Sequence, residues 1–394
     1  MAAPFRTPLT SAVDDETFQA LKETVHRYVR ERLVPLEAKV EADAAVPTEV
    51  VAELKDMGLF GTTIPVAYGG LGLAVSQEVQ LAEEFGWTSP AFRGVFGTTI
   101  GIGSQGIVMD GTEEQKREFL PKLARGEYVS SFCLTEPGSG SDAASLRTTA
   151  IVDGRDYVVN GTKRYITNAR HADVLTLMAR TDPANKGAGG ISAFIVDAKS
   201  KGISYGPKDE KMGQRGTVTS DVIFENVRVP AGRIIGLKPG QGFKTAMKVL
   251  DRGRLHIAAV CIGAARRLIH EAMTYSGDRT QFGQPIGSFQ LVQAMLADSW
   301  TELYATETMV RDAARRYDAG EPTVMEAAAS KMYASEMAGR VADRAVQIFG
   351  GAGYMAVSPV ERMYRDVRLF RLYEGTTQIQ QLIIAREMRK AHIG

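Results

Sequence analysis

Two short segments of the sequence carry groups that could do chemistry. Residues 132–142 (FCLTEPGSGSD) gather hydroxyl groups around a Pro-Gly turn, and residues 374–378 (EGTTQ) place the carboxylate of Glu374 just before a predicted helix. A loop of the first kind offers N–H and O–H donors to a planar polar or anionic ligand. One hypothesis is that Leu372 and Tyr373 partly desolvate this carboxylate, which would raise its pKa toward the range of a general base. The plainer alternatives are a surface turn and a charge that complements a helix dipole.

Three further features are less specific. Tyr165 and Thr167 place an aromatic ring close to a hydroxyl, as an ordinary strand also does. Residues 349–353 (FGGAG) follow a predicted helix, and their glycines either let the backbone approach a ligand or simply end that helix. Thr376 or Thr377 can cap the last helix, whose free N–H groups favour an anion.

Several common kinds of site are missing from the sequence. It contains no Gly-x-Gly-x-x-Gly after a strand, no Walker A lysine and no His-Glu-x-x-His, and its five histidines are scattered. Cys133 and Cys261 are far apart, which argues against a disulfide framework or a structural zinc site. These absences argue against a nicotinamide-type Rossmann site and a metal site. Chemistry must therefore come from carboxylates, from backbone-rich loops or from a bound cofactor.

Charge and hydropathy limit the partners and the location. Lys and Arg total 47 against 46 Asp and Glu, a formal charge of +1, so no net basic field attracts nucleic acid or anionic lipid. The charge-free run at 94–109 is too short and too polar to span a membrane, and the N-terminus lacks the apolar core of a secretory signal. We therefore expect a cytoplasmic protein.

The elements that must position these groups follow an α, β, α order. A chain of 394 residues suggests two or three domains. We expect an α+β fold with a helical domain at 1–127, an antiparallel β-domain at 128–240 and a four-helix bundle at 241–394. Predicted helices lie at 16–33, ending or kinking at Val34-Pro35, at 48–57 with Thr48 as N-cap, at 77–85 and at 113–124. Predicted strands lie at 157–159, 164–166, 174–178, 191–196 and 218–229, with turns at 153–154, 160–161 and 189–190. The bundle helices are predicted around 257–275, 292–320, 325–348 and 376–388.

Taken together, four segments at this spacing resemble the acyl-CoA dehydrogenase family, nearest to its short- and medium-chain enzymes. They are residues 134–142 (LTEPGSGSD), 278–283 (DRTQFG), 347–351 (QIFGG) and 373–378 (YEGTTQ), and the resemblance extends over residues 18–389. It implies an FAD enzyme that oxidises acyl-CoA thioesters to trans-2-enoyl-CoA in fatty acid β-oxidation or amino acid catabolism. It also implies a homotetramer, built as a dimer of dimers, that passes electrons to an electron-transfer flavoprotein.

The resemblance also implies the cofactor contacts. Thr135 and Thr167 would lie near the reactive N5 of the flavin, and Tyr165 stands where the family usually has Trp. Arg279, Gln281 and Phe282, with Gln347 and Gly351, would reach the FAD of a neighbouring subunit. The full implied set is Phe132, Leu134, Thr135, Gly140, Ser141, Tyr165, Ile166, Thr167, Arg279, Gln281, Phe282, Gln290, Gln347, Gly350, Gly351, Thr376 and Gln378.

For catalysis, the resemblance implies that Glu374 takes the α-proton while the β-hydrogen leaves as hydride to flavin N5. Some branches carry the base on an earlier helix, but here Gly253 stands in that place. Arg93 falls where the glutaryl-CoA branch binds a distal carboxylate, although a structural or solvent-facing arginine is the plainer alternative. The implied substrate contacts are Arg93, Ser141, Asp251, Arg254, Tyr373 and Gly375.

Two other functions remain open at this level. One is an oxygen-using flavoenzyme of the same fold, similar to an acyl-CoA oxidase or a nitroalkane oxidase. The other is a non-catalytic protein that binds acyl-CoA. Retention of Glu374 and of every flavin segment argues against the second.

Overall fold

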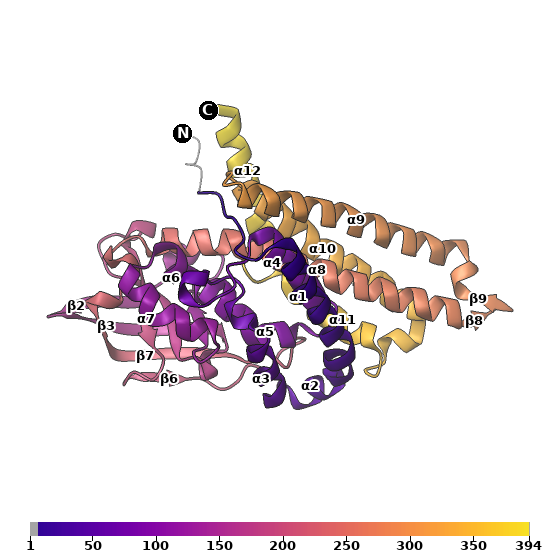
Figure 1. The fold of residues 1–394 in the computed structure, drawn as a ribbon, viewed down its shortest axis with the longest axis horizontal. Helices are drawn as coiled ribbons and strands as arrows, with labels where there is room; N and C mark the ends of the chain where they lie inside the picture. The colour runs from indigo at the N-terminus through magenta and orange to yellow at the C-terminus, as the bar shows by residue number, and fades with distance from the viewer. Residues whose placement is uncertain (1–6, 394) are drawn as a thin grey trace.

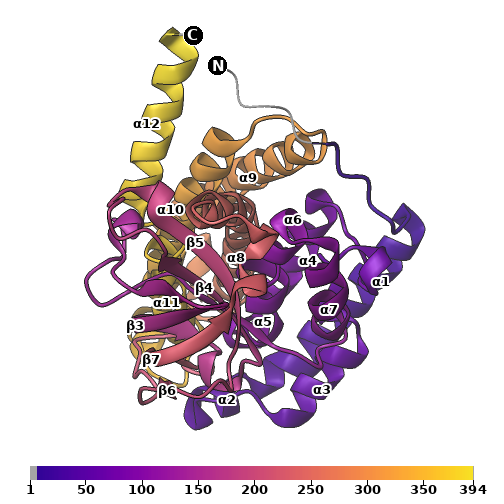
Figure 2. The ribbon, with the colours of Figure 1, turned by 90° about the vertical axis from the view of Figure 1, so that its left-hand side faces the viewer.

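The structure is a computed structural model, and it describes residues 7–393. The residues before Thr7, on which the expectation about a secretory signal partly rests, lie outside the described range. Figure 1 shows the sheet at one end of the molecule and the long helices α8, α9 and α10 running toward the other end. Figure 2 shows the N-terminal helices beside the sheet, so that sheet, N-terminal helices and bundle meet in the middle of the molecule. Within the described range, no helix is long and apolar enough to cross a membrane.

The N-terminal part is helical, as predicted, and the interruption predicted at Val34-Pro35 is present. At Val34-Pro35 the chain passes through a π turn and a 3-10 turn before it becomes helical again, because proline cannot donate a helical hydrogen bond. Thr48 was predicted to be an N-cap and is instead the first helical residue, since the extended Pro47 takes the cap position. The helices are α1 (Asp15–Tyr28), α2 (Glu37–Asp43), α3 (Thr48–Asp56), α4 (Val75–Gly86), α5 (Pro90–Thr98), α6 (Gln105–Asp110) and α7 (Glu113–Ala124).

The central sheet has seven strands in the order β1-β4-β2-β3-β7-β6, with β5 paired to β4. Most pairs are antiparallel, as predicted, but β1 and β2 both run parallel to β4. The turn at Asp153-Gly154 does join two antiparallel strands, and Gly154 has the positive φ of +65° that this turn requires. The strands are β1 (Ser130–Cys133), β2 (Thr149–Asp153), β3 (Asp156–Thr167), β4 (Val174–Arg180), β5 (Ile191–Asp197), β6 (Ile203–Tyr205) and β7 (Thr219–Pro230).

The turn predicted at Asn160-Gly161 is wrong, because β3 runs straight through it. The register with β7 shifts between Val159 and Gly161, so the glycine marks a β-bulge rather than a hairpin. A second shift lies between Lys163 and Ile166. It puts Tyr165 at φ +59° and leaves its ring 64% exposed. The bulge therefore turns an aromatic side chain out of the sheet.

The C-terminal part holds the four predicted long helices and one short helix, α11, that was not foreseen. Alanine is the commonest residue on the buried faces of α8 and α10, which lets these two helices pack closely. Beyond α8 the chain forms a small exposed hairpin of β8 (Thr280–Gln281) and β9 (Gln284–Pro285). The helices are α8 (Gly242–Asp278), α9 (Gln290–Asp318), α10 (Val324–Phe349), α11 (Pro359–Val367) and α12 (Thr377–Ile393).

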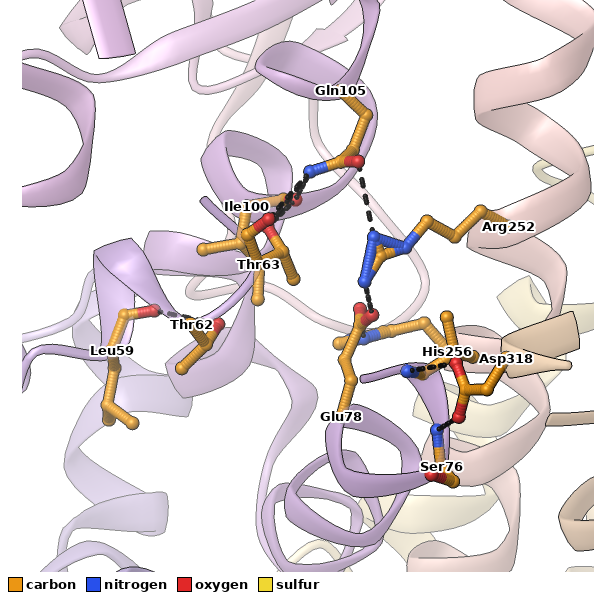
Figure 3. Close-up of polar contacts among 11 residues, drawn as sticks. Leu59, Thr62, Thr63, Ser76, Glu78, Ile100, Gln105, Arg252, His256 and Asp318 are labelled. Carbon is orange, nitrogen blue, oxygen red and sulfur yellow. Dashed lines mark hydrogen bonds and ion pairs between the residues drawn. The ribbon is translucent and has the colours of Figure 1, made fainter. Parts of the chain in front are cut away.

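Two contacts fix α4 against the bundle. Gly86 and Gly263 face each other where α4 crosses α8, and a Cβ atom on either would overlap the backbone of the opposite helix. The start of α4 is capped from a distance: the Asp318 carboxylate, at the end of α9, accepts hydrogen bonds from Val75 N (2.8 Å) and Ser76 N (2.9 Å) (Figure 3). Together these contacts hold α4 alongside the first half of α8.

Candidate active site

A cavity of about 850 Å³ lies where the sheet, the N-terminal helices and the bundle meet. Its walls come from the loop after β1, the end of β3, α5, α8, the 373–375 segment and α12. The structure thus brings together segments that are far apart in the sequence. Of the predicted site residues, those that line the cavity are Arg93, Phe132, Leu134, Thr135, Gly140, Ser141, Tyr165, Ile166, Thr167, Asp251, Arg254, Tyr373, Glu374 and Gly375.

The remaining predicted residues do not line this cavity. Thr376 caps α12, its Oγ1 accepting from Ile379 N at 3.3 Å, and Gln378 follows it as an exposed residue. The others lie at the end of the bundle that points away from the sheet, near the β8–β9 hairpin (Figure 1). These are Arg279, Gln281, Phe282, Gln290, Gln347, Gly350 and Gly351.

Glu374 stands in an unusual backbone conformation. Its φ is +53° and that of Gly375 is +92°, so two consecutive residues occupy the left-handed region. The side-chain amide of Gln380 donates to the carbonyl oxygens of both residues at 3.0 Å. Lys331 Nζ donates to the Gly375 carbonyl at 2.7 Å. The turn that carries the carboxylate is thus held from below by α12 and α10.

The carboxylate itself is withdrawn from solvent without a direct partner. Within residues 7–393, Glu374 Oε2 is buried and accepts no hydrogen bond. Burial raises the pKa of Glu374, and the positive charges of Arg93, Lys331 and Arg254 act against this rise. The expectation that this carboxyl group is desolvated is therefore confirmed. A carboxylate of this kind is a stronger base than an exposed one.

Gly253 leaves the space that this carboxylate occupies. A Cβ atom at position 253 would lie 2.5 Å from Glu374 Oε2, which is closer than real Cβ contacts. A side chain at 253 and the present position of the Glu374 carboxylate therefore exclude each other. One residue further on, Arg254 is 3% exposed and its guanidinium is bonded to Asp251, so a buried cation lies next to the base.

A chain of buried polar groups reaches the cavity from the other side. Arg93 Nε donates to His256 Nε2 at 2.9 Å, and His256 Nδ1 bonds Glu78 Oε1 at 2.9 Å. Because arginine only donates, His256 must be neutral at Nε2 and carry its proton on Nδ1. Figure 3 shows that Glu78 also pairs with Arg252, which in turn bonds Gln105 Oε1 at 3.2 Å.

This network has a defined charge state. Burial and the charge of Arg93 lower the pKa of His256, so the imidazole stays neutral. Burial alone would raise the pKa of Glu78, but Arg252 and His256 hold it below its usual range. Sequence analysis missed these residues. Arg252 and His256 are one helical turn apart and could have been paired on one face, whereas nothing local in the sequence connects Glu78 to them.

The sheet wall of the cavity is built differently. The buried Lys163 Nζ donates to the Leu134 carbonyl at 3.1 Å and to Glu136 Oε1 at 2.8 Å, which fixes the loop after β1. Thr217 and Thr219 line the cavity, and in the described part of the chain their buried hydroxyls have no hydrogen-bond partner. Free hydroxyls and an exposed aromatic ring fit a planar ring system such as a flavin.

Comparison with known families gives a consistent answer. Sequence models of the N-terminal, middle and C-terminal domains of acyl-CoA dehydrogenases match residues 15–127, 131–227 and 240–389. A probable acyl-CoA dehydrogenase of Mycobacterium leprae is 40% identical over 95% of both chains. An acryloyl-CoA reductase (NADH) of Anaerotignum propionicum is also 40% identical, over 94% of both chains.

Solved structures agree with the sequence matches. Butyryl-CoA dehydrogenase from Megasphaera elsdenii superposes with a TM-score of 0.91 at 34% identity, covering 96% of this chain and 99% of its own. A chain from work on the electron transferring flavoprotein of Acidaminococcus fermentans gives a TM-score of 0.91 at 35% identity, covering 96% and 99%. An acyl-CoA dehydrogenase complexed with FAD from Bacillus anthracis gives 0.89 at 34% identity, covering 99% of this chain and 69% of that one.

Proposed function

Because this chain belongs to the acyl-CoA dehydrogenase family, whose members use FAD, we propose that Glu374 is the base that removes the α-proton of its acyl-CoA substrate. The observation that carries this proposal is the Glu374 carboxylate, which is buried at the cavity and has an unpartnered Oε2 within residues 7–393. The raised pKa of Glu374 is closer to the pKa of the weakly acidic α-carbon of the substrate, which favours proton transfer between them.

A second group of the same residue supports the proposal. The hydrogen bonds found among the described residues leave the backbone N–H of Glu374 without an acceptor. A free N–H can donate to a thioester oxygen, and this bond strengthens as negative charge develops there. Glu374 would therefore polarise the substrate through its backbone and deprotonate it through its side chain.

The sheet wall would hold the cofactor. Thr135, Thr167 and Thr219 offer hydroxyl groups to it, and Tyr165 offers a ring face. When bound, FAD supplies the oxidising chemistry, namely a ring that accepts the β-hydrogen as hydride. The protein's part is to keep the α- and β-carbons between this wall and Glu374 and to exclude water from them.

The test is spectroscopic. The purified protein, kept under anaerobic conditions, should show yellow flavin absorbance that bleaches on addition of an acyl-CoA. Peroxide formed in air at the rate of turnover would favour the oxygen-using alternative. A flavin-free protein that still binds acyl-CoA would favour the non-catalytic one. Either result contradicts the proposed dehydrogenase.

We further propose an electron-transfer flavoprotein as the acceptor, which the similarity to the Acidaminococcus fermentans chain supports. One relative of similar identity is named acryloyl-CoA reductase (NADH), a name that describes reduction of an enoyl-CoA instead of oxidation of an acyl-CoA. Two assays separate these cases. Electron-transfer flavoprotein should be reduced by enzyme and acyl-CoA together, whereas an enoyl-CoA should not oxidise NADH in the presence of the enzyme alone.

For the acyl end, we propose that Arg93 contacts a polar or carboxylated tail. Arg93 lines the cavity, and its Nε donates a hydrogen bond to His256. Among residues 7–393 Arg93 has no carboxylate in salt-bridge contact, although its charge acts on Glu374 and Glu78. Turnover of glutaryl-CoA should therefore exceed that of butyryl-, isobutyryl- and octanoyl-CoA, and Arg93→Ala should remove this preference. Equal preference in wild type and Arg93→Ala would contradict the assignment.

Finally, we propose a homotetramer in which each FAD is contacted by two subunits. Arg279, Gln281 and Phe282 lie far from the cavity of their own chain, and Phe282 is 93% exposed. These positions support a role toward a second copy. Sedimentation analysis should give a tetramer, and Arg279→Ala should weaken FAD retention without changing the acyl-CoA preference. A monomer that retains FAD would contradict this proposal.

A further inference from the structure

Lys331 is a fully buried lysine in the middle of α10. Its exposed fraction is 0%, and its neighbours on the buried face of the helix are small residues, among them Ala327, Ala328 and Ala334. Lysine is almost never fully buried unless it is paired. Within residues 7–393, Lys331 forms no ion pair with a carboxylate, and its hydrogen bond goes to the Gly375 carbonyl at 2.7 Å. The buried cation is thus directed at the backbone of the base segment.

The carbonyl that Lys331 holds belongs to a strained turn. Left-handed backbone is unfavourable for a non-glycine residue, and Glu374 has a φ of +53°. Such a conformation persists only where its surroundings fix it. Gln380 supplies neutral hydrogen bonds to this turn, whereas Lys331 supplies a charge-assisted one, which is the stronger kind.

We infer that Lys331 is a positioning residue for Glu374: its ammonium group, bonded to the Gly375 carbonyl, fixes the turn that holds the Glu374 carboxylate at the cavity. This inference rests on the proposed role of Glu374 as the base. It assigns to α10, which among the described residues lines the cavity only at Val324, the task of keeping the base in place.

The charges around Lys331 give the inference a pH signature. Burial lowers the pKa of Lys331 to about 8, and the groups that act on it are Cys261 and Arg254 of α8, Glu374, and Glu336 of its own helix. Burial also raises the pKa of the Cys261 thiol, so this neighbour stays neutral and does not replace the charge. Above a pH of about 8 the ammonium loses its proton, and the charge-assisted bond to the Gly375 carbonyl is lost. Activity should therefore fall on the alkaline side in this range.

The experiment compares three variants of the flavin-loaded enzyme. Lys331→Met keeps the length of the side chain and removes the charge, whereas Lys331→Arg keeps a charge that does not titrate in this range. Ser335→Ala is the matched control, because Ser335 is buried one turn along α10 and bonds only within its own helix. For each protein one measures kcat and KM against pH with the best acyl-CoA, together with flavin content and thermal unfolding.

The expected result separates positioning from packing. Lys331→Met should lose at least tenfold in kcat with KM and flavin content nearly unchanged, and its profile should lack the alkaline fall near pH 8. Lys331→Arg should recover part of kcat and move the alkaline fall to higher pH, and Ser335→Ala should match wild type.

Two outcomes would overturn the inference. One is an unchanged kcat and alkaline fall in Lys331→Met. The other is a loss in all three variants that follows their thermal stability, which would make Lys331 a packing residue. If none of the acyl-CoA substrates bleaches the flavin of the wild-type enzyme, the proposed function itself fails. That failure is seen in the wild type alone and is therefore distinct from a failure of the inference about Lys331.

Discussion

Each of the two walls of the cavity has a fully buried lysine beneath its loop, and the two lysines differ in their partners. Under the sheet wall, Lys163 bonds the Leu134 carbonyl and also pairs with the Glu136 carboxylate. Under the helical wall, Lys331 bonds the Gly375 carbonyl and has no such carboxylate within residues 7–393. The lysine under the sheet loop is therefore neutralised by a carboxylate, whereas the lysine that holds the base segment together with Gln380 is not.

The difference follows from what each wall has to do. A wall that holds an uncharged ring needs no compensating charge at its anchor, and the Lys163–Glu136 pair carries no net charge. A wall that holds a buried carboxylate needs positive charge close by, or the carboxylate would be protonated. Arg93, Arg254 and Lys331 supply this charge. The following predictions test this contrast, from the largest expected effect to the smallest.

Glu374→Gln should have the largest effect. It removes the proposed base from the charged wall and should lower kcat by about 10²- to 10⁴-fold, while the sheet wall keeps its flavin. Stopped-flow measurement of flavin bleaching checks the first part and the absorbance spectrum the second. Because the pKa of Glu374 is raised in the fold, stability falls as the pH rises from the pKa of the unfolded chain to that of the folded one, and the full cost remains above it. The Gln variant should thus unfold at the same or a higher temperature at pH 8, and a less stable variant would contradict this.

Lys163→Met should affect the fold more than the chemistry. Removing one partner of a buried ion pair leaves Glu136 uncompensated and should cost about 3–5 kcal/mol of unfolding free energy. Lys199→Met is the control, because the Lys199–Asp173 pair lies at the surface and should contribute less than about 1 kcal/mol. Denaturant unfolding of both variants measures the difference. Equal losses would mean that the buried pair does not stabilise the sheet wall.

Gly253→Ala should act on the position of the base alone. The added methyl group would lie 2.5 Å from Glu374 Oε2, so the carboxylate must move, and kcat should fall by about 10- to 100-fold. Gly277→Ala is the control on the same helix, because a Cβ atom there meets nothing within 4 Å. The control should keep full activity and gain up to about 1 kcal/mol of stability. Equal activity of the two variants would show that Gly253 does not make room for the base.

Arg93→Met should move the pH profile. The Glu374 carboxylate must be ionised to accept a proton. Burial raises its pKa, and Arg93 is the charge that opposes this rise most strongly. Removing the guanidinium should raise the pKa of Glu374 further. As the pH is lowered, the variant should therefore lose activity at a higher pH than the wild type does. The acid side of the kcat/KM profile measures this shift. A shift to lower pH would mean that Arg93 does not act on the base.

Thr219→Val should have the smallest effect, and it should act on the sheet wall. Within the described residues the Thr219 hydroxyl is buried without a partner, so the isosteric valine should leave the flavin-free protein at least as stable. If the hydroxyl serves the cofactor, the dissociation constant of FAD should rise a few-fold. Fluorescence titration with FAD measures the dissociation constant, and thermal unfolding of the flavin-free protein measures its stability. A less stable protein with unchanged FAD binding would contradict the prediction.

Much of the fold follows from local patterns in the sequence, and the exceptions have physical causes. The long bundle helices and the cap at Thr376 depend on neighbours within a few residues, so they could be predicted. The continuity of β3 through Asn160-Gly161 and the parallel pairing of β1 with β4 depend on strands far along the chain. A glycine that favours a turn also permits a bulge, and only the partner strand decides between them.

The same distinction holds for the candidate site. Glu374 and the loop after β1 could be singled out because their chemistry lies within a few consecutive residues. Glu78 and His256 could not, because 178 positions separate the two residues of this contact. Lys331 gave a weak signal, as the single charge on a face of small residues, and its partner carbonyl could not be foreseen from sequence.

The cap that Asp318 provides to α4 has a consequence for how the polypeptide can be divided. In a fragment that stops after residue 127, the first amides of α4 would lack their acceptor, because Asp318 lies 243 residues after Val75. Synthesis must therefore reach the end of α9 before the helix that carries Glu78 acquires its final start. The three apparent modules should then melt in a single cooperative transition, and none should be a dependable unit for transplantation into another enzyme.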